Sequence, residues 1–150
     1  MILDTDILIW YLRGDLAAKN FVEENLPFSV SSVTYMELTQ GMKDKAEFRR
    51  FQKTFKKWKS EIIHLDQEIS SRAVFYVQEY ALSHSMKLAD ALISATAVQN
   101  GETLATANEK HYKFIPNIEL KKFVPGNIQE KADAMLIPKI AEQDDFQWEG

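Results

Sequence analysis

Two carboxylates interrupt the apolar start of the chain. Asp4 and Asp6, separated by Thr5, stand among strongly apolar residues in the first ten positions. A buried charge is costly unless it is paired or binds a metal. We therefore predict a buried strand at 2–3 that ends at Asp4, and a helix that begins near Asp6. In a parallel sheet this geometry places a carboxylate at the carboxyl ends of the strands, where open α/β sheets bind their ligands. The alternative is that Asp6 caps the helix and Asp4 accepts from nearby backbone amides.

Three further positions place an acid or an amide at the end of a predicted strand or at the start of a helix. Glu37 follows the second predicted strand, Asp90 opens an Ala-rich helix, and Asn108 follows the fourth strand. The carboxyl ends of parallel strands lie along one edge of a sheet, so these side chains can converge there with Asp4. The sequence thus predicts one polar site built from four distant segments.

Each of these positions also has a purely structural explanation. Thr34 and Glu37 have the spacing of a capping box, in which the glutamate bonds back to the threonine amide. Asp90 in a first turn suits the helix dipole. Asn108 is a good N-cap residue, with or without a further role. Singly these signals are weak, and their joint placement with Asp4 is what favours a functional site.

Strands and helices alternate along the chain. This order is typical of a parallel sheet with helices on both faces, so we predict an α/β fold with three layers, α/β/α, and a short, mostly parallel sheet of four to five strands. Apolar periodicity and turn residues predict strands at 2–3, 28–31, 61–65, 103–106 and 118–123. They predict helices near 6 and at 15–26, 34–41, 44–59, 66–83 and 88–98, with a helical turn at 108–114.

The composition is that of a soluble globular protein, with 45% hydrophobic and 27% charged residues and no cysteine. A disulfide framework and a thiolate metal site are therefore excluded. No signal peptide or membrane span is expected, and we predict a cytoplasmic protein. Pro125-Gly126 marks the predicted boundary between a domain at 1–125 and an acidic extension at 126–150.

The net charge of −4 belongs to this extension, which holds six acidic residues against two basic ones. The first 125 residues carry 16 of each sign, so the acidity of the whole chain does not argue against a nucleic-acid ligand. The extension also contains Phe146 and Trp148. We predict that it packs against the basic helix described next, and the alternative is a disordered solubilising tail.

The predicted helix at 44–59 has one apolar and one basic face. Aromatic residues recur at helical spacing, and we interpret them as core; they are Phe48, Phe51, Phe55 and Trp58. Half of the positive charge of the first 125 residues lies at 43–59. A solvated face is the common explanation, but an excess of one sign can also hold a phosphate backbone. Our candidates for RNA binding are Lys45, Arg49, Arg50 and Lys53.

Four motifs in this order resemble those of the PIN-domain ribonucleases, and most closely the VapC-type toxins of bacterial toxin–antitoxin pairs. The motifs are Asp4-Thr5-Asp6-Ile-Leu-Ile, Ser32-Val-Thr34-Tyr-Met-Glu37-Leu, Ala89-Asp90-Ala-Leu-Ile-Ser-Ala95 and Thr106-Ala-Asn108-Glu-Lys-His111-Tyr112. The resemblance covers roughly residues 1–125. It implies a metal-dependent endoribonuclease that cleaves RNA, a separate antitoxin protein as partner, and a homodimer.

The resemblance also implies roles for individual residues. Asp4, Glu37 and Asp90 would be the three central acids of a site for Mg²⁺ or Mn²⁺. Thr5 would be the hydroxyl beside the first acid, and Asp6 stands where the family often has a small polar residue. The chemistry agrees, because a divalent cation activates water and neutralises phosphate charge without a catalytic His or Cys.

The last motif departs from the family pattern. Three residues after the asparagine the family commonly has a fourth acid, and this chain has His111. A fourth contact would then fall to Asn108, directly or through water, with Thr106 and His111 as supporting residues. This difference argues against binding of a second metal.

Two other functions share parts of this pattern. A PIN fold retained as a binding module would fit the replacement of an acid by His111. The phosphatases of the haloacid-dehalogenase type also open with an apolar strand and Asp-x-Asp, but there Gly-Thr usually follows the second Asp. Here Ile7 and Leu8 follow it, and the late part of the predicted domain at 1–125 has no paired acids.

Overall fold

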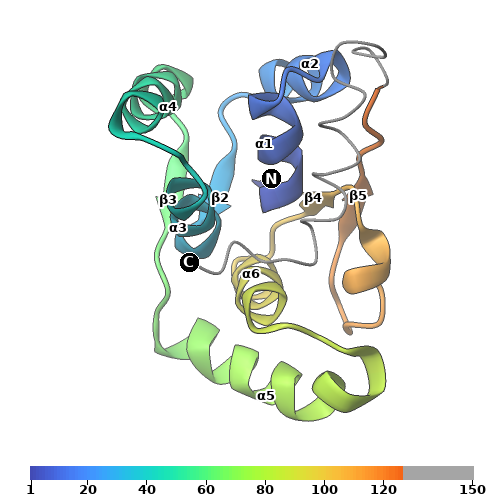
Figure 1. Ribbon diagram of the computed structural model, residues 1–150. Coiled ribbons are helices and arrows are strands. Elements are labelled where there is room, and N and C mark those ends of the chain that lie inside the picture. Colours follow the sequence, from blue (N-terminus) through green and yellow to red (C-terminus); the bar gives the residue numbers. More distant parts are fainter. Residues whose placement is uncertain (127–150) are drawn as a thin grey trace.

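A computed structural model describes residues 1–126, so the predicted extension lies outside the described residues apart from Gly126. Figure 1 shows a central sheet between two layers of helices. The strands are β1 (Ile2–Leu3), β2 (Ser29–Ser31), β3 (Glu61–Ile63), β4 (Leu104–Thr106) and β5 (Leu120–Lys122). The helices are α1 (Thr5–Leu12), α2 (Leu16–Glu24), α3 (Ser32–Gln40), α4 (Lys45–Trp58), α5 (Gln67–His84) and α6 (Leu88–Gln99), with a 3₁₀ turn η1 (Glu109–His111). The predicted α/β class is confirmed.

All strand pairs in the sheet are parallel, and the strand order is β3-β2-β1-β4-β5. The chain first builds the sheet outward from β1 to β2 and β3, and then returns to place β4 on the other side of β1. Ile2 pairs with both Ser29 and Leu104. The direction of winding therefore reverses between β1 and β4, and ligands of open α/β sheets bind beside such a point.

Neighbouring residues of one strand pack against different helical layers. Ile2 and Leu104 belong to the cluster formed with α5 and α6, whereas Leu3 and Ala105 belong to the cluster formed with α1, α2 and α4. Side chains alternate across a strand, so both faces must be apolar when helices cover both. Figure 1 shows α5 and α6 on one side of the sheet and α1 and α2 on the other.

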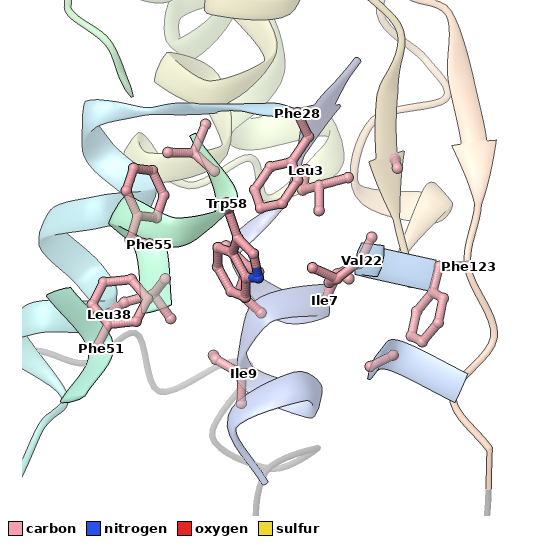
Figure 2. Close-up of a cluster of buried hydrophobic side chains, with 14 residues drawn as sticks. Leu3, Ile7, Ile9, Val22, Phe28, Leu38, Phe51, Phe55, Trp58 and Phe123 are labelled. Carbon is pink, nitrogen blue, oxygen red and sulfur yellow. The ribbon is translucent and has the colours of Figure 1, made fainter. Parts of the chain in front are cut away.

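The aromatic face of α4 packs into the second of these clusters (Figure 2). Phe51, Phe55 and Trp58 are buried, and the Trp58 ring centroid lies 5.3 Å from that of Phe28. The predicted core role of these three is confirmed, while Phe48 is half-buried. The basic residues of α4 proposed for RNA binding, Lys45, Arg49, Arg50 and Lys53, are all exposed. Helix α4 therefore has one face in the core and one basic face in solvent.

The helix predicted to begin near Asp6 begins at Thr5, and its cap is Asp4 rather than Asp6, because the Asp4 carboxylate accepts from the Thr5 amide. The predicted start of α3 was wrong. Ser31 caps α3 through the Val33 amide, so this helix begins two residues earlier than predicted. Thr34 consequently lies inside α3, and the predicted capping box with Glu37 does not form. None of the helices within residues 1–126 is both long and apolar enough to cross a membrane.

Candidate active site at the switch point of the sheet

Asp4 lies at the carboxyl end of β1 and is buried with three hydrogen bonds. Its Oδ1 accepts from the Thr5 amide at 2.8 Å, which caps α1. Its Oδ2 accepts from the Thr106 hydroxyl at 2.8 Å and from the Tyr112 hydroxyl at 3.0 Å. Thr106 ends β4, the neighbour of β1 in the sheet. The parallel pairing of these two strands therefore places the hydroxyl beside the carboxylate.

Asp90 approaches Asp4 from the first turn of α6. The Tyr112 hydroxyl lies 3.2 Å from Asp90 Oδ1 and so links the two carboxyl groups. On its other side, Asp90 Oδ2 lies 3.7 Å from His111 Nδ1. The structure thus brings together Asp4, Asp90 and His111, three of the residues that the sequence proposed for the site.

Glu37 reaches the same region through Thr5. The Thr5 hydroxyl lies 2.7 Å from Glu37 Oε1 and 2.9 Å from the hydroxyl of Thr34. Thr5 is in the first turn of α1 and Glu37 is in the middle of α3, so contact between these two helices sets the distance. Glu37 therefore contacts the residue next to Asp4 in the chain, and the Thr5 side chain lies between the two acids.

Asp6 fixes the loop that follows β4. Its Oδ2 accepts from the Ala107 amide at 3.0 Å, from Asn108 Nδ2 at 3.0 Å and from the Thr106 hydroxyl at 3.2 Å. Asn108 occupies the N-cap position of η1, but its side chain makes no capping bond there. Asn108 is thus tied to Asp6 instead, and the predicted side-chain cap is not formed.

The electrostatics of the site follow from burial and from the closeness of its acids. Burial, and then the charge of Asp90, raise the pKa of Asp4 from its ordinary 3.8 to about 7, against the hydrogen bonds from Thr106 and Tyr112. Burial and the charges of Asp4, Asp90 and Asp6 raise the pKa of Tyr112 well above 10. Tyr112 therefore remains a hydrogen-bond donor at physiological pH.

The donor set fits a hard divalent cation. Within residues 1–126, no three His, Asp or Glu side chains are close enough to form a metal site by themselves. Mg²⁺ does not need such a cage, since it keeps several waters and binds through one or two carboxylates together with substrate phosphates. Asp4 and Asp90 offer two carboxylates, and burial together with the charge of Asp90 raises the pKa of Asp4, an effect that a bound cation would offset.

One residue that contacts both acids was not singled out from the sequence. Tyr112 stood in the last motif without a role, although its hydroxyl lies within hydrogen-bond distance of both Asp4 and Asp90. A tyrosine in a segment next to a predicted strand end was the available signal, because a buried tyrosine hydroxyl usually has a partner. Its acceptors depend on how η1 packs under α6, which no local pattern reveals.

A family model described as PIN domain matches residues 1–115. Ribonuclease VapC10 of Mycobacterium tuberculosis is 30% identical over 133 residues, covering 85% of this chain and 96% of that protein. A chain of a toxin–antitoxin complex from Klebsiella pneumoniae is 33% identical with a TM-score of 0.66, over 78% of this chain and 93% of that one.

A second solved structure shows the same fold at lower identity. It is VapBC2 from Rickettsia felis bound to a DNA fragment from its promoter, with 24% identity, a TM-score of 0.69, and coverage of 82% of this chain and 98% of that one. The resemblance predicted from four motifs is therefore confirmed across the sheet and both helical layers. The chain belongs to the PIN-domain family.

Proposed function

We propose that the protein is a metal-dependent endoribonuclease that hydrolyses RNA phosphodiester bonds and acts as the toxin of a toxin–antitoxin pair. The observation that carries this proposal is the joining of Asp4 and Asp90 at the switch point of a PIN-family sheet. A relative that is 30% identical is named a ribonuclease, and it matches 96% of its own length. The family match also favours the nuclease over a haloacid-dehalogenase-like phosphatase.

In this proposal Asp4 and Asp90 hold the cation directly, and Glu37 completes the acidic site from α3. PIN-domain VapC ribonucleases are generally dependent on a divalent metal, and the all-oxygen donors here favour Mg²⁺ or Mn²⁺. When bound, the cation neutralises charge on the phosphodiester and activates a water for attack on phosphorus.

The remaining polar residues hold this arrangement in place. Thr5 bonds to Glu37, and Thr106 bonds to Asp4 and lies 3.2 Å from Asp6. Asp6 in turn holds Asn108 at the mouth of the loop after β4. Asn108 is then placed to contact substrate or a water, and His111 supports Asp90 from the side opposite Tyr112.

The partners follow from the same proposal. The substrate is RNA, the inhibitor is a cognate antitoxin protein, and the toxin forms a homodimer in the cytoplasm. A 33% identical chain belongs to a toxin–antitoxin complex, which supports an antitoxin partner here. Co-expression with the product of the neighbouring gene should give a complex that co-purifies and has no nuclease activity.

The enzymatic proposal is tested by a nuclease assay on RNA with Mn²⁺ or Mg²⁺. We expect cleavage by the wild type, none with EDTA, and a loss of at least about 100-fold in Asp4→Asn and Asp90→Asn, because each variant removes a carboxylate ligand. Asp66→Asn is the matched control, since Asp66 is exposed and caps α5. Asparagine caps equally well there, so this variant should keep full activity.

Two results would contradict the proposal. Phosphatase activity without RNA cleavage would indicate the dehalogenase-like alternative. A folded wild type without metal-dependent cleavage of any RNA tested would instead favour a PIN fold that serves as a binding module.

A further inference from the structure

Tyr112 is a fully buried tyrosine whose hydroxyl lies inside the acidic site. Its ring belongs to the apolar cluster beneath α5 and α6, together with Ile2, Leu104 and Ile115. Protein interiors are close-packed, so a ring enclosed in this way has one well-defined position. The core of the protein, rather than a flexible side chain, therefore determines where this hydroxyl lies.

The hydroxyl meets one oxygen of each acid. It lies 3.0 Å from Asp4 Oδ2 and 3.2 Å from Asp90 Oδ1, although these residues come from β1 and from α6. Each carboxylate has about four lone-pair sites. The single hydrogen of the Tyr112 hydroxyl can be shared between the two acids, and each keeps lone pairs that can bind a cation.

Asp4 and Asp90 depend on this contact to different degrees. Asp4 is buried and is also held by the Thr5 amide and the Thr106 hydroxyl. The Asp90 side chain is 21% exposed and its Oδ2 lies 3.7 Å from His111 Nδ1, so it is less enclosed than Asp4 and has solvated directions into which it can turn. A hydroxyl fixed by the core opposes such a turn and keeps Asp90 aimed at Asp4.

We propose that Tyr112 is a positioning residue that holds Asp90 beside Asp4 in the geometry that binds the divalent cation. This inference rests on the proposed function, because it concerns the same site. Partners that orient metal ligands typically change metal affinity 10- to 100-fold when they are removed. Tyr112 acts through the two acids and does not itself touch the substrate.

The test is the affinity for Mn²⁺, measured by titration calorimetry on the full chain without RNA. Tyr112→Phe removes the hydroxyl and keeps the ring that fills the core. We expect its Kd for Mn²⁺ to rise at least about tenfold. Tyr80→Phe is the matched control, since the Tyr80 ring packs on Phe114 in the same cluster. This control should bind Mn²⁺ as the wild type does.

A double variant separates positioning from a general loss of structure. If Tyr112 works through Asp90, adding Tyr112→Phe to Asp90→Asn should weaken Mn²⁺ binding by much less than adding it to the wild type. Equal effects in the two backgrounds would overturn the inference. Circular dichroism and the melting temperature without metal show whether each variant is folded.

The remaining outcomes are also decisive. Unchanged or tighter Mn²⁺ binding by folded Tyr112→Phe would overturn the positioning role, and tighter binding would mean that the hydroxyl competes with the metal. A wild type that does not bind Mn²⁺ would instead refute the metal site of the proposed function, and the inference with it. Should Tyr112→Phe not fold, ultraviolet difference spectra of the wild type decide instead. Mn²⁺ should then change the absorption of a buried tyrosine, and the same change should be seen in Tyr80→Phe. No such change would overturn the inference.

Discussion

At the scale of single residues, Asp4 has two roles that share one side chain. Its Oδ1 caps α1 by accepting from Thr5, while its Oδ2 takes part in the acidic site with Thr106 and Tyr112. The structural explanation for this residue is therefore confirmed, and the same side chain has a second oxygen available for the proposed metal site. A cap is commonly worth about 1 kcal/mol, so substitutions at Asp4 should replace it by Asn, which can also cap.

The metal-free protein should lose stability as the pH rises from about 4 to about 7. The pKa of Asp4 is raised from 3.8 to about 7, so in this interval the unfolded chain releases a proton that the folded protein retains. The contribution of Asp4 to the free energy of unfolding should fall by up to about 4 kcal/mol and then level off above pH 7.

Urea denaturation in EDTA at several pH values measures this effect. The difference in unfolding free energy between Asp4→Asn and the wild type should grow in favour of the variant from pH 4 to 7. Asp66→Asn should follow the wild type throughout. A difference that does not vary with pH would show that Asp4 is not held protonated in the folded protein.

At the scale of elements, the helix starts that depend on a single local capping residue were predicted correctly from the sequence. Asp15, Asp44 and Asp66 each cap a helix within one residue of its predicted start. The prediction for α3 failed because Ser31 and Thr34 are both good capping residues, and only the end of β2 decides between them. Local patterns therefore find the elements, and tertiary contacts choose between equivalent boundaries.

The side-chain contacts of the site could not be predicted in the same way. The four segments were identified because Asp4, Asp90 and Asn108 lie at strand ends or helix starts, while Glu37 lies in the helix that follows β2 directly. The bond between Thr5 and Glu37 depends on how α1 meets α3. The bridge from Tyr112 depends on the packing of η1, a turn of three residues. Such contacts join residues far apart in the chain, and periodicity carries no information about them.

The two faces of α4 give a prediction that belongs to this element. Reversing Arg49 and Arg50 to Glu should weaken binding of single-stranded RNA and reduce the slope of log affinity against log salt by about 1.4, since two phosphate contacts are lost. Stability should change by no more than about 0.5 kcal/mol, because both residues are exposed. Fluorescence anisotropy in EDTA measures binding without cleavage.

The control for this experiment makes the same change of charge elsewhere. Lys19 and Lys113 are exposed and lie outside α4, so reversing both to Glu alters the net charge equally. If this control weakens RNA binding as much as the α4 variant, the effect is one of overall charge and α4 has no special role.

At the scale of the whole molecule, we expect the acidic site to oppose folding until a cation binds. Two buried or half-buried carboxylates are held together at the switch point, and the pKa of Asp4 records the resulting cost. A ligand that binds only the folded state stabilises it by mass action. The site should therefore couple metal binding to the stability of the entire domain.

Mn²⁺ at about 100 times its Kd should stabilise the wild type by about 2.7 kcal/mol. For a chain of this size we expect the melting temperature to rise by about 5–10 °C, measured by calorimetry. Asp90→Asn should show little of this rise, and Asp66→Asn should show all of it. Sodium chloride of equal ionic strength should not reproduce the effect; if it does, screening rather than specific binding is responsible.

The pairing of β1 with β4 has a consequence for how the protein is made. Strand β1 emerges from the ribosome first, but its partner β4 and the residues that complete the site, Thr106 and Tyr112, are translated about a hundred positions later. Until then, the nascent chain contains all three acids but lacks strand β4 and the two hydroxyl groups that position them. We therefore expect a nuclease that is harmless to the ribosome and message producing it, and that becomes active only when its synthesis is nearly finished.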